Sequence, residues 1–195
     1  MNTARLEAFS DGVMAILITI MVLELKVPHD ATVGALRDMT PQLLSYVLSF
    51  VYLGIYWNNH HHLFHVVEHL NGAIMWANLH LLFWLSLVPF VTAWMGENHF
   101  APFPTACYGA ALLMAALAYT ILVRVIIGHH GKDSKVARAI GSDAKGNVSL
   151  AMYAAAIPLA FVHTAIADAL YAGVAVIWLV PDRRIERQLK AEARR

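Results

Sequence analysis

The chain has 195 residues, of which 59% are hydrophobic and 14% are charged, and its formal net charge is +1. An ordinary soluble domain carries about 25% charged residues and about 45–50% apolar ones, so the composition excludes that class. The single cysteine, Cys107, excludes an intrachain disulfide. The composition predicts an integral membrane protein that crosses the bilayer several times.

Six apolar segments are candidates for membrane-spanning helices, which need about 20 residues each. Thr40 and Pro41 suit the N-cap and first turn of the second helix, which is expected to continue past residue 57 through a run of histidines. Pro89 is expected to kink the third helix. The expected helices cover residues 6–25, 41–57, 72–95, 104–127, 148–162 and 165–180. We therefore predict an all-α protein with one domain of six transmembrane helices over residues 1–195.

Lysine and arginine are concentrated on one side of the predicted membrane. Arg5 precedes the first helix, a basic group lies at or beyond the end of the fourth, and a basic tail over 182–195 follows the sixth. Cytoplasmic loops carry an excess of these residues, so both termini are expected to be cytoplasmic, as an even number of helices requires. The tail is expected to be solvated or to lie against anionic headgroups.

The first helix carries a narrow stripe of residues at helical spacing. Gly12, Ile16, Thr19 and Leu23 follow i, i+4, i+7 and i+11 and share one face. Rings of branched apolar side chains around a central axis can form a dewetting gate, and a ring of threonine hydroxyls can coordinate ions in part. The alternative is ordinary packing between helices, and spacing alone favours it.

Two polar residues, Ser10 and Asp11, lie near the start of the same helix. A carboxylate inside a membrane helix is costly and normally faces protein or a water-filled cavity. We expect a hydrogen-bonded cluster that fixes the rotation of the helix; the alternative is that Asp11 binds the permeant cation. The candidate partners of Asp11 are Arg5, Trp76, Asn78, His80 and Trp84.

A histidine run from Trp57 to His65 follows the second apolar segment. His61 and His65 have the i, i+4 spacing that suits zinc. Adjacent histidines point in different directions around a helix, so interfacial polar packing with pH sensitivity is favoured over a metal site.

Phosphate loops, GxSxG and HExxH are absent, so we expect no enzymatic activity. The paired broken helices of transporters and the TVGYG potassium filter are absent too. Two other classes stay open: a proton- or metal-coupled transporter that uses Asp11 and the histidines, and a membrane scaffold without transport.

Several short motifs lie in order along the chain. They are Arg5-x-x-x-Phe9-Ser10-Asp11 followed by Ala15-Ile16 and Thr19, then Trp57-x-x-His60-His61-x-Leu63-Phe64, then Asn78 with Pro89-Phe90, and finally Ile177-Trp178-Leu179. Together they resemble the signature of the transmembrane protein 175 family of lysosomal potassium channels. The chain resembles the bacterial branch, which encodes one six-helix unit per chain.

This resemblance implies a homotetramer in a prokaryotic cell membrane, with the first helix of each subunit lining a potassium pore. By position from the FSD motif, Ile16 and Leu23 would form the hydrophobic constriction, with Thr19 as a hydroxyl ring between them. The resemblance implies that the helix is held in place by Arg5, Phe9, Ser10 and Asp11. The expected partners are other copies of the chain, potassium ions and the lipid bilayer, with no nucleic acid and no cofactor beyond the permeant ion.

Overall fold

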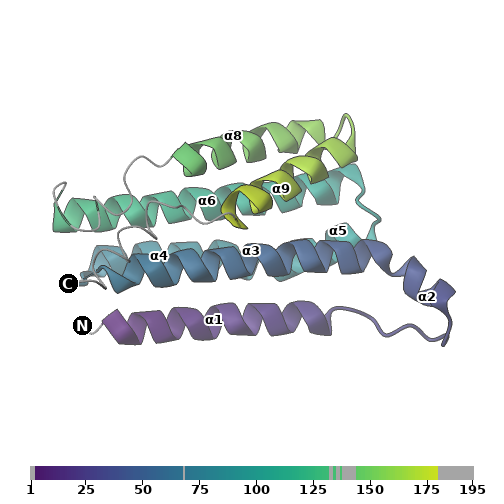
Figure 1. The fold of residues 1–195 in the computed structure, drawn as a ribbon, viewed down its shortest axis with the longest axis horizontal. Coiled ribbons are helices and arrows are strands. Elements are labelled where there is room, and N and C mark those ends of the chain that lie inside the picture. The colour runs from purple at the N-terminus through teal and green to yellow at the C-terminus, as the bar shows by residue number, and fades with distance from the viewer. Residues whose placement is uncertain (1–2, 68, 132–133, 135–136, 138–143, 180–195) are drawn as a thin grey trace, which may run out of the picture.

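The structure is a computed structural model, and it describes residues 3–67, 69–131, 134, 137 and 144–179. The basic tail predicted over 182–195 lies outside the described residues. The helices form an elongated bundle in which α1 lies along one edge (Figure 1). Their bounds are α1 Thr3–Leu23, α2 Val33–Asp38, α3 Thr40–His65, α4 Gly72–Ser86, α5 Val88–Glu97, α6 Pro102–His130, α8 Ala144–Leu159 and α9 Thr164–Leu179.

The expected helix over 72–95 is divided into two at Leu87. Pro89 lies in the first turn of α5 and has no backbone N–H to continue the ladder of α4. The Leu87 N–H instead bonds the Trp84 carbonyl at 3.3 Å, which tightens the last turn of α4. The helix is therefore interrupted at one residue, Leu87, whose backbone angles remain in the right-handed helical region.

The connection between α1 and α3 contains a short helix, α2, that the hydropathy pattern does not predict. Its N-cap is Thr32, whose hydroxyl accepts a hydrogen bond from the Ala35 N–H at 3.2 Å. Pro41 lies in the first turn of α3, as expected. The expectation that Thr40 caps this helix is wrong, because the cap is Met39 and the Thr40 hydroxyl donates to the Arg37 carbonyl at 2.6 Å.

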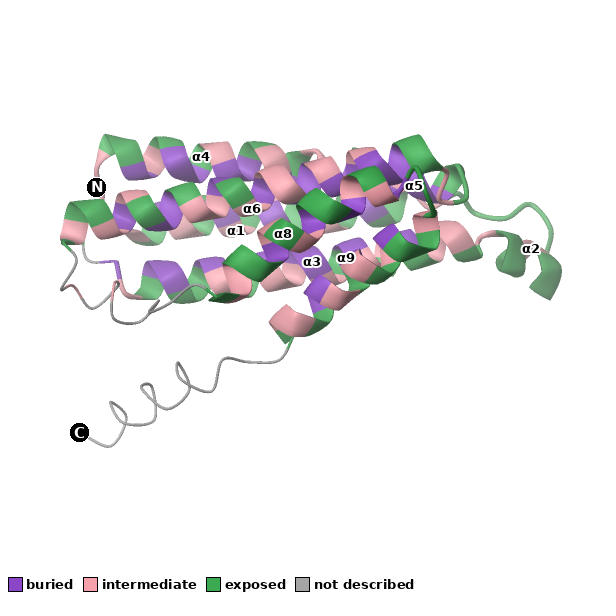
Figure 2. Ribbon diagram, turned by 90° about the horizontal axis from the view of Figure 1, so that it is seen from above, coloured by how far each residue is buried: buried purple, intermediate pink, exposed green. Residues whose placement is uncertain are grey.

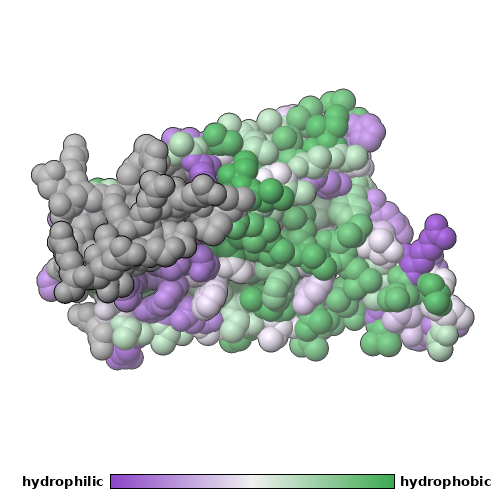
Figure 3. Space-filling model, viewed as in Figure 1, coloured by the Kyte–Doolittle hydropathy of each residue, from purple (hydrophilic) through white to green (hydrophobic). Residues whose placement is uncertain are grey.

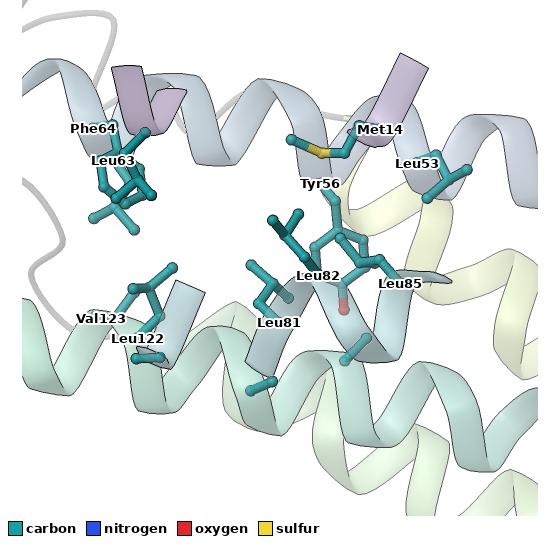
Figure 4. Close-up of a cluster of buried hydrophobic side chains, with 14 of the residues drawn as sticks. Met14, Leu53, Tyr56, Leu63, Phe64, Leu81, Leu82, Leu85, Leu122 and Val123 are labelled. Atoms are coloured by element: carbon teal, nitrogen blue, oxygen red, sulfur yellow. The ribbon is translucent and has the colours of Figure 1, made fainter. Parts of the chain in front are cut away.

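Apolar packing holds the bundle together in two adjoining cores. One core joins α1, α3, α4, α6 and the first residue of α5, and Figure 4 shows Met14 of α1 beside Leu53 and Tyr56 of α3, with leucines of α4 close by. The other joins α3, α5, α6, α8 and α9 around a group of buried tyrosines. On the face shown in Figure 3, hydrophobic residues dominate along the middle of the bundle, while hydrophilic residues gather toward its ends.

Within the described residues, three stretches are long and apolar enough to cross a membrane. They are Thr3–Leu23, Gly72–Glu97, which comprises α4 and α5, and Pro102–His130. The helix α9 is apolar but shorter. An apolar exterior on a bundle with apolar cores is the arrangement expected of a protein surrounded by lipid.

The close approach of α6 and α9 depends on a glycine. A Cβ atom at Gly109 would collide with the Tyr171 hydroxyl, which is held in place because it donates to the Thr105 carbonyl at 3.1 Å. We expect Gly109→Ala to lower the stability of the folded protein by about 1–3 kcal/mol, the usual cost of overpacking. Thermal unfolding in detergent measures the effect.

The matched control is Gly54→Ala on α3, where a new Cβ would meet nothing within 4 Å. This variant should be neutral or slightly stabilising, because alanine favours helix more than glycine does. Equal melting temperatures for the two variants would contradict the role assigned to Gly109.

Candidate functional site

The two faces of α1 have opposite environments, and buried and exposed residues alternate in the same way along the other helices of the bundle (Figure 2). Its buried residues recur every three or four positions and pack against α3, α4 and α5. They are Leu6, Ser10, Met14, Leu17 and Met21. The stripe of Gly12, Ile16, Thr19 and Leu23 is exposed and lies about 150° around the helix from the buried face. Ile16 is 57% exposed and Leu23 is 81% exposed, so packing within the chain does not account for the stripe.

Thr19 presents an oxygen atom on this exposed face. Its hydroxyl donates to the carbonyl of Ile16, one turn earlier, at 2.8 Å. A hydroxyl has one proton and two lone pairs. Because the Thr19 proton is donated to the Ile16 carbonyl, the hydroxyl oxygen can only accept from, or coordinate, a group on the exposed side of the helix. A cation is a suitable partner for such an oxygen.

A buried network of hydrogen bonds, which we call the polar anchor, holds α1 against α3 and α4. It consists of Ser10, Asn78 and His60, which are all at most 1% exposed. The Asn78 Nδ2 donates to the Ser10 Oγ at 2.9 Å, and the Ser10 hydroxyl donates to the Leu6 carbonyl at 2.9 Å. The His60 Nε2 lies 2.8 Å from the Asn78 Oδ1 and must donate to it, since an amide oxygen only accepts.

The polar anchor can fix the rotation of α1. Its hydrogen bonds lie in an apolar core, where an unpaired polar group is costly. Turning α1 about its axis would break the bond between Ser10 and Asn78 and expose the apolar residues packed around it. The exposed stripe is therefore held on the side facing away from the bundle.

Asp11 is not part of the polar anchor in the structure. Its Oδ1 is buried without a hydrogen-bond partner, and the side chain bonds no described residue, Arg5 included. The structure brings Ser10 to Asn78, as expected of the cluster, but leaves Asp11 beside it. By helical geometry Asp11 lies on the flank between the buried face and the stripe, about 100° from Gly12.

The remaining expected partners lie elsewhere. His80 accepts a hydrogen bond from the Trp84 indole N–H within α4 at 2.9 Å. Trp76 is 74% exposed and Phe9 is 53% exposed, so both point away from the core. His60 was not among the expected partners of α1. In the sequence, His60 stands out only as the first histidine of the histidine run. In the structure, it is the histidine of that run on the buried side of α3.

His61 and His65, the two histidines with metal-ligand spacing, are exposed on α3. Across the described ranges, no three histidine, cysteine, aspartate or glutamate side chains are grouped as metal ligands.

An ion pair links the chain just after α1 to the end of α5. The Lys26 Nζ lies 2.7 Å from the Glu97 Oε1, and both side chains are substantially exposed. The hydrogen bond to the Glu97 carboxylate raises the pKa of Lys26 above its usual value. Exposed ion pairs of this kind stabilise weakly. The position of α1 therefore depends mainly on the polar anchor and on the packing of its apolar face.

Comparison with known proteins identifies the family. A family model described as endosomal/lysosomal potassium channel TMEM175 matches residues 5–89. A potassium channel of Chryseobacterium sp. (strain P1-3) is 55% identical over 190 residues, which are 97% of this chain and 99% of that protein. The chain belongs to the TMEM175 family, in its bacterial branch.

A solved structure agrees with this assignment. The crystal structure of a lysosomal potassium-selective channel TMEM175 homolog from Chamaesiphon minutus matches with a TM-score of 0.80 and 28% sequence identity. The match covers 91% of this chain and 96% of the other. The TMEM175 chain described here is thus an all-helical potassium channel of the membrane, and it is not an enzyme. A transporter mechanism is not favoured by any of these relatives.

The vertebrate relatives match a smaller part of the chain. The protein from Danio rerio, named endosomal/lysosomal proton channel TMEM175, is 38% identical over 81 residues, which are 35% of this chain and 16% of that protein.

Proposed function

We propose that copies of this TMEM175 chain assemble as a homotetramer, with the exposed stripe of each α1 lining a central potassium pore. The observation that carries this proposal is the pairing of an exposed apolar stripe with a buried polar anchor on the opposite side of one helix. Exposed apolar side chains of a membrane helix can face lipid, but a hydroxyl group between two apolar residues on the same face is better suited to a shared axis, around which the stripe gives stacked rings of identical side chains. The distribution of basic residues in the sequence supports cytoplasmic termini.

In this arrangement Ile16 and Leu23 form the constriction. A narrow apolar ring excludes water and blocks ions when closed, and it passes an ion only if part of its hydration shell is lost. Sodium is smaller than potassium and holds its water more strongly, so partial dehydration costs sodium more. An apolar constriction therefore favours potassium without a filter of backbone carbonyls.

Thr19 lies between these two rings along the helix. Its outward oxygen supplies partial coordination where the ion has lost water, which lowers the barrier at the midpoint of the constriction. No cofactor is needed for such a function, because the permeant ion itself is the only ligand.

The polar anchor has a positioning role in this proposal. Ser10, Asn78 and His60 hold α1 at the rotation that aims the stripe at the axis. Asp11, which lies beside the polar anchor on the flank of α1, braces the helix through a neighbouring subunit or meets the cation directly. Asp11→Asn distinguishes the two: loss of assembly supports bracing, whereas intact tetramers with weakened potassium binding support a cation ligand.

The direct test is a flux assay on purified protein in liposomes, paired with a measurement of oligomeric mass. We expect potassium flux to exceed sodium flux and the mass to be that of four chains plus bound detergent. A monomeric mass, or equal fluxes of the two ions, would contradict the proposal.

A further inference from the structure

The exposed side of α3, near its C-terminal end, carries two histidines one helical turn apart. The ring centroids of His61 and His65 are 6.2 Å apart, with 33° between the ring planes. Residues at i and i+4 share one face of a helix, and two histidines with this spacing are the arrangement that helical zinc sites use. His65 forms no hydrogen bond with any described residue, so its ring nitrogens are available.

A carboxylate from another helix orients the first of these rings. The Glu7 Oε1 of α1 lies 2.7 Å from the His61 Nδ1. Because a carboxylate only accepts, Nδ1 carries the proton, and the lone pair of Nε2 is left free. Histidines that bind metals donate their other ring N–H to a carboxylate in this way, which fixes the ring orientation and the tautomer.

We propose that His61 and His65, with Glu7 as the orienting group, bind a divalent transition-metal ion. Imidazole nitrogens suit copper(II), nickel(II) and zinc(II). Since no third protein ligand is grouped with this pair among the described residues, water fills the remaining positions. The site is separate from the exposed stripe of α1, and the proposal does not depend on the pore or on the oligomeric state.

His62 provides a matched comparison within the same run. It lies about 100° further around α3 than His61, and its ring plane is turned by 57° from that of His61. It has no carboxylate partner among the described residues. A general affinity of clustered histidines for metal would involve His62 as much as its neighbours, whereas the proposed site does not use it.

A nearby tryptophan supplies a local signal for the experiment. The ring of Trp57 is stacked on that of His61, with centroids 6.3 Å apart and 20° between the planes. Copper(II) bound at His61 should therefore quench the fluorescence of Trp57. The assay titrates full-length, tag-free protein in detergent with copper(II), and Trp57→Phe identifies the part of the signal that comes from this residue.

We expect saturable quenching that is weakened by acidification, because the imidazoles must be deprotonated to bind metal. Glu7→Gln should weaken the apparent affinity about tenfold or more, as the loss of an orienting group does. His61→Gln and His65→Gln should weaken it further, while His62→Gln should leave it unchanged. Gel filtration shows that each variant remains folded; these positions are exposed, apart from the partly buried Glu7.

Two results would overturn the proposal. One is an unchanged titration in folded His65→Gln, which would leave His61 as a single weak ligand. The other is an equal loss of affinity in His62→Gln and His61→Gln, which would mean that the histidine run binds metal without a defined site.

Discussion

Replacing Ile16 by asparagine is expected to raise sodium flux through the channel. In the proposed tetramer the amide attracts water into the ring of four side chains at position 16, so a sodium ion crosses with more of its hydration shell intact. Each 1.4 kcal/mol removed from a barrier increases the rate about tenfold, so we expect an increase of about tenfold or more. Sodium and potassium fluxes into liposomes, measured on the same preparation, check the result.

A matched control for this prediction is Ile121→Asn on α6. Ile121 is also an isoleucine with an exposed side chain, at 44% compared with 57% for Ile16. It lies outside the proposed pore, so the same chemical change there should leave the ratio of sodium to potassium flux unaltered. An unchanged ratio in Ile16→Asn, or an equal rise in both variants, would remove Ile16 from the constriction.

Removing the central member of the polar anchor should produce the largest loss of stability. In Asn78→Ala the buried His60 N–H loses its acceptor and Ser10 loses its donor. A buried polar group left unpaired costs about 1–3 kcal/mol, and the lost packing around Asn78 adds to this. We expect a lower melting temperature and less assembled protein, measured by thermal unfolding and by gel filtration in detergent.

Asn59→Ala tests whether the effect belongs to the polar anchor. The Asn59 side chain donates to the Ile55 carbonyl within its own helix at 2.8 Å and joins no other helix. Its loss should cost little. If Asn59→Ala and Asn78→Ala lowered the melting temperature equally, the polar anchor would have no special part in holding α1.

The exposed face of α1 could be predicted from the sequence, because helical geometry alone determines which residues share a side. The period of Gly12, Ile16, Thr19 and Leu23 predicts a stripe, and the structure exposes it. The same reasoning could not choose between a pore and packing against another helix of the chain. That choice depends on which elements cover α1, and no local pattern contains this information.

The partner of α1 was predicted only in part. An intramembrane asparagine must find hydrogen bonds, so Asn78 was a candidate, and the structure pairs it with Ser10. His60 was missed because three consecutive histidines suggest a polar surface. The rotation of α3 buries the first of them and exposes the second, and that rotation is set by the apolar residues of the whole helix.

The distortion near Pro89 was expected, but the division into α4 and α5 at Leu87 and the short helix α2 were not predicted, for local reasons. A proline inside a long apolar segment predicts a distortion, but whether the helix bends or divides depends on how the next turn is packed. The six residues of α2 are too few to show a period, and only its cap at Thr32 gave a sign of it.

The exposure of the stripe also bears on how this family can change over evolutionary time. The side chains at Ile16, Thr19 and Leu23 contribute little to the interior of their own protomer, so mutations there escape the usual penalty for disturbing a core. In the proposed pore, permeation properties can therefore change without loss of the fold. A library randomised at these three codons should yield mostly well-folded protein with widely different ion preferences.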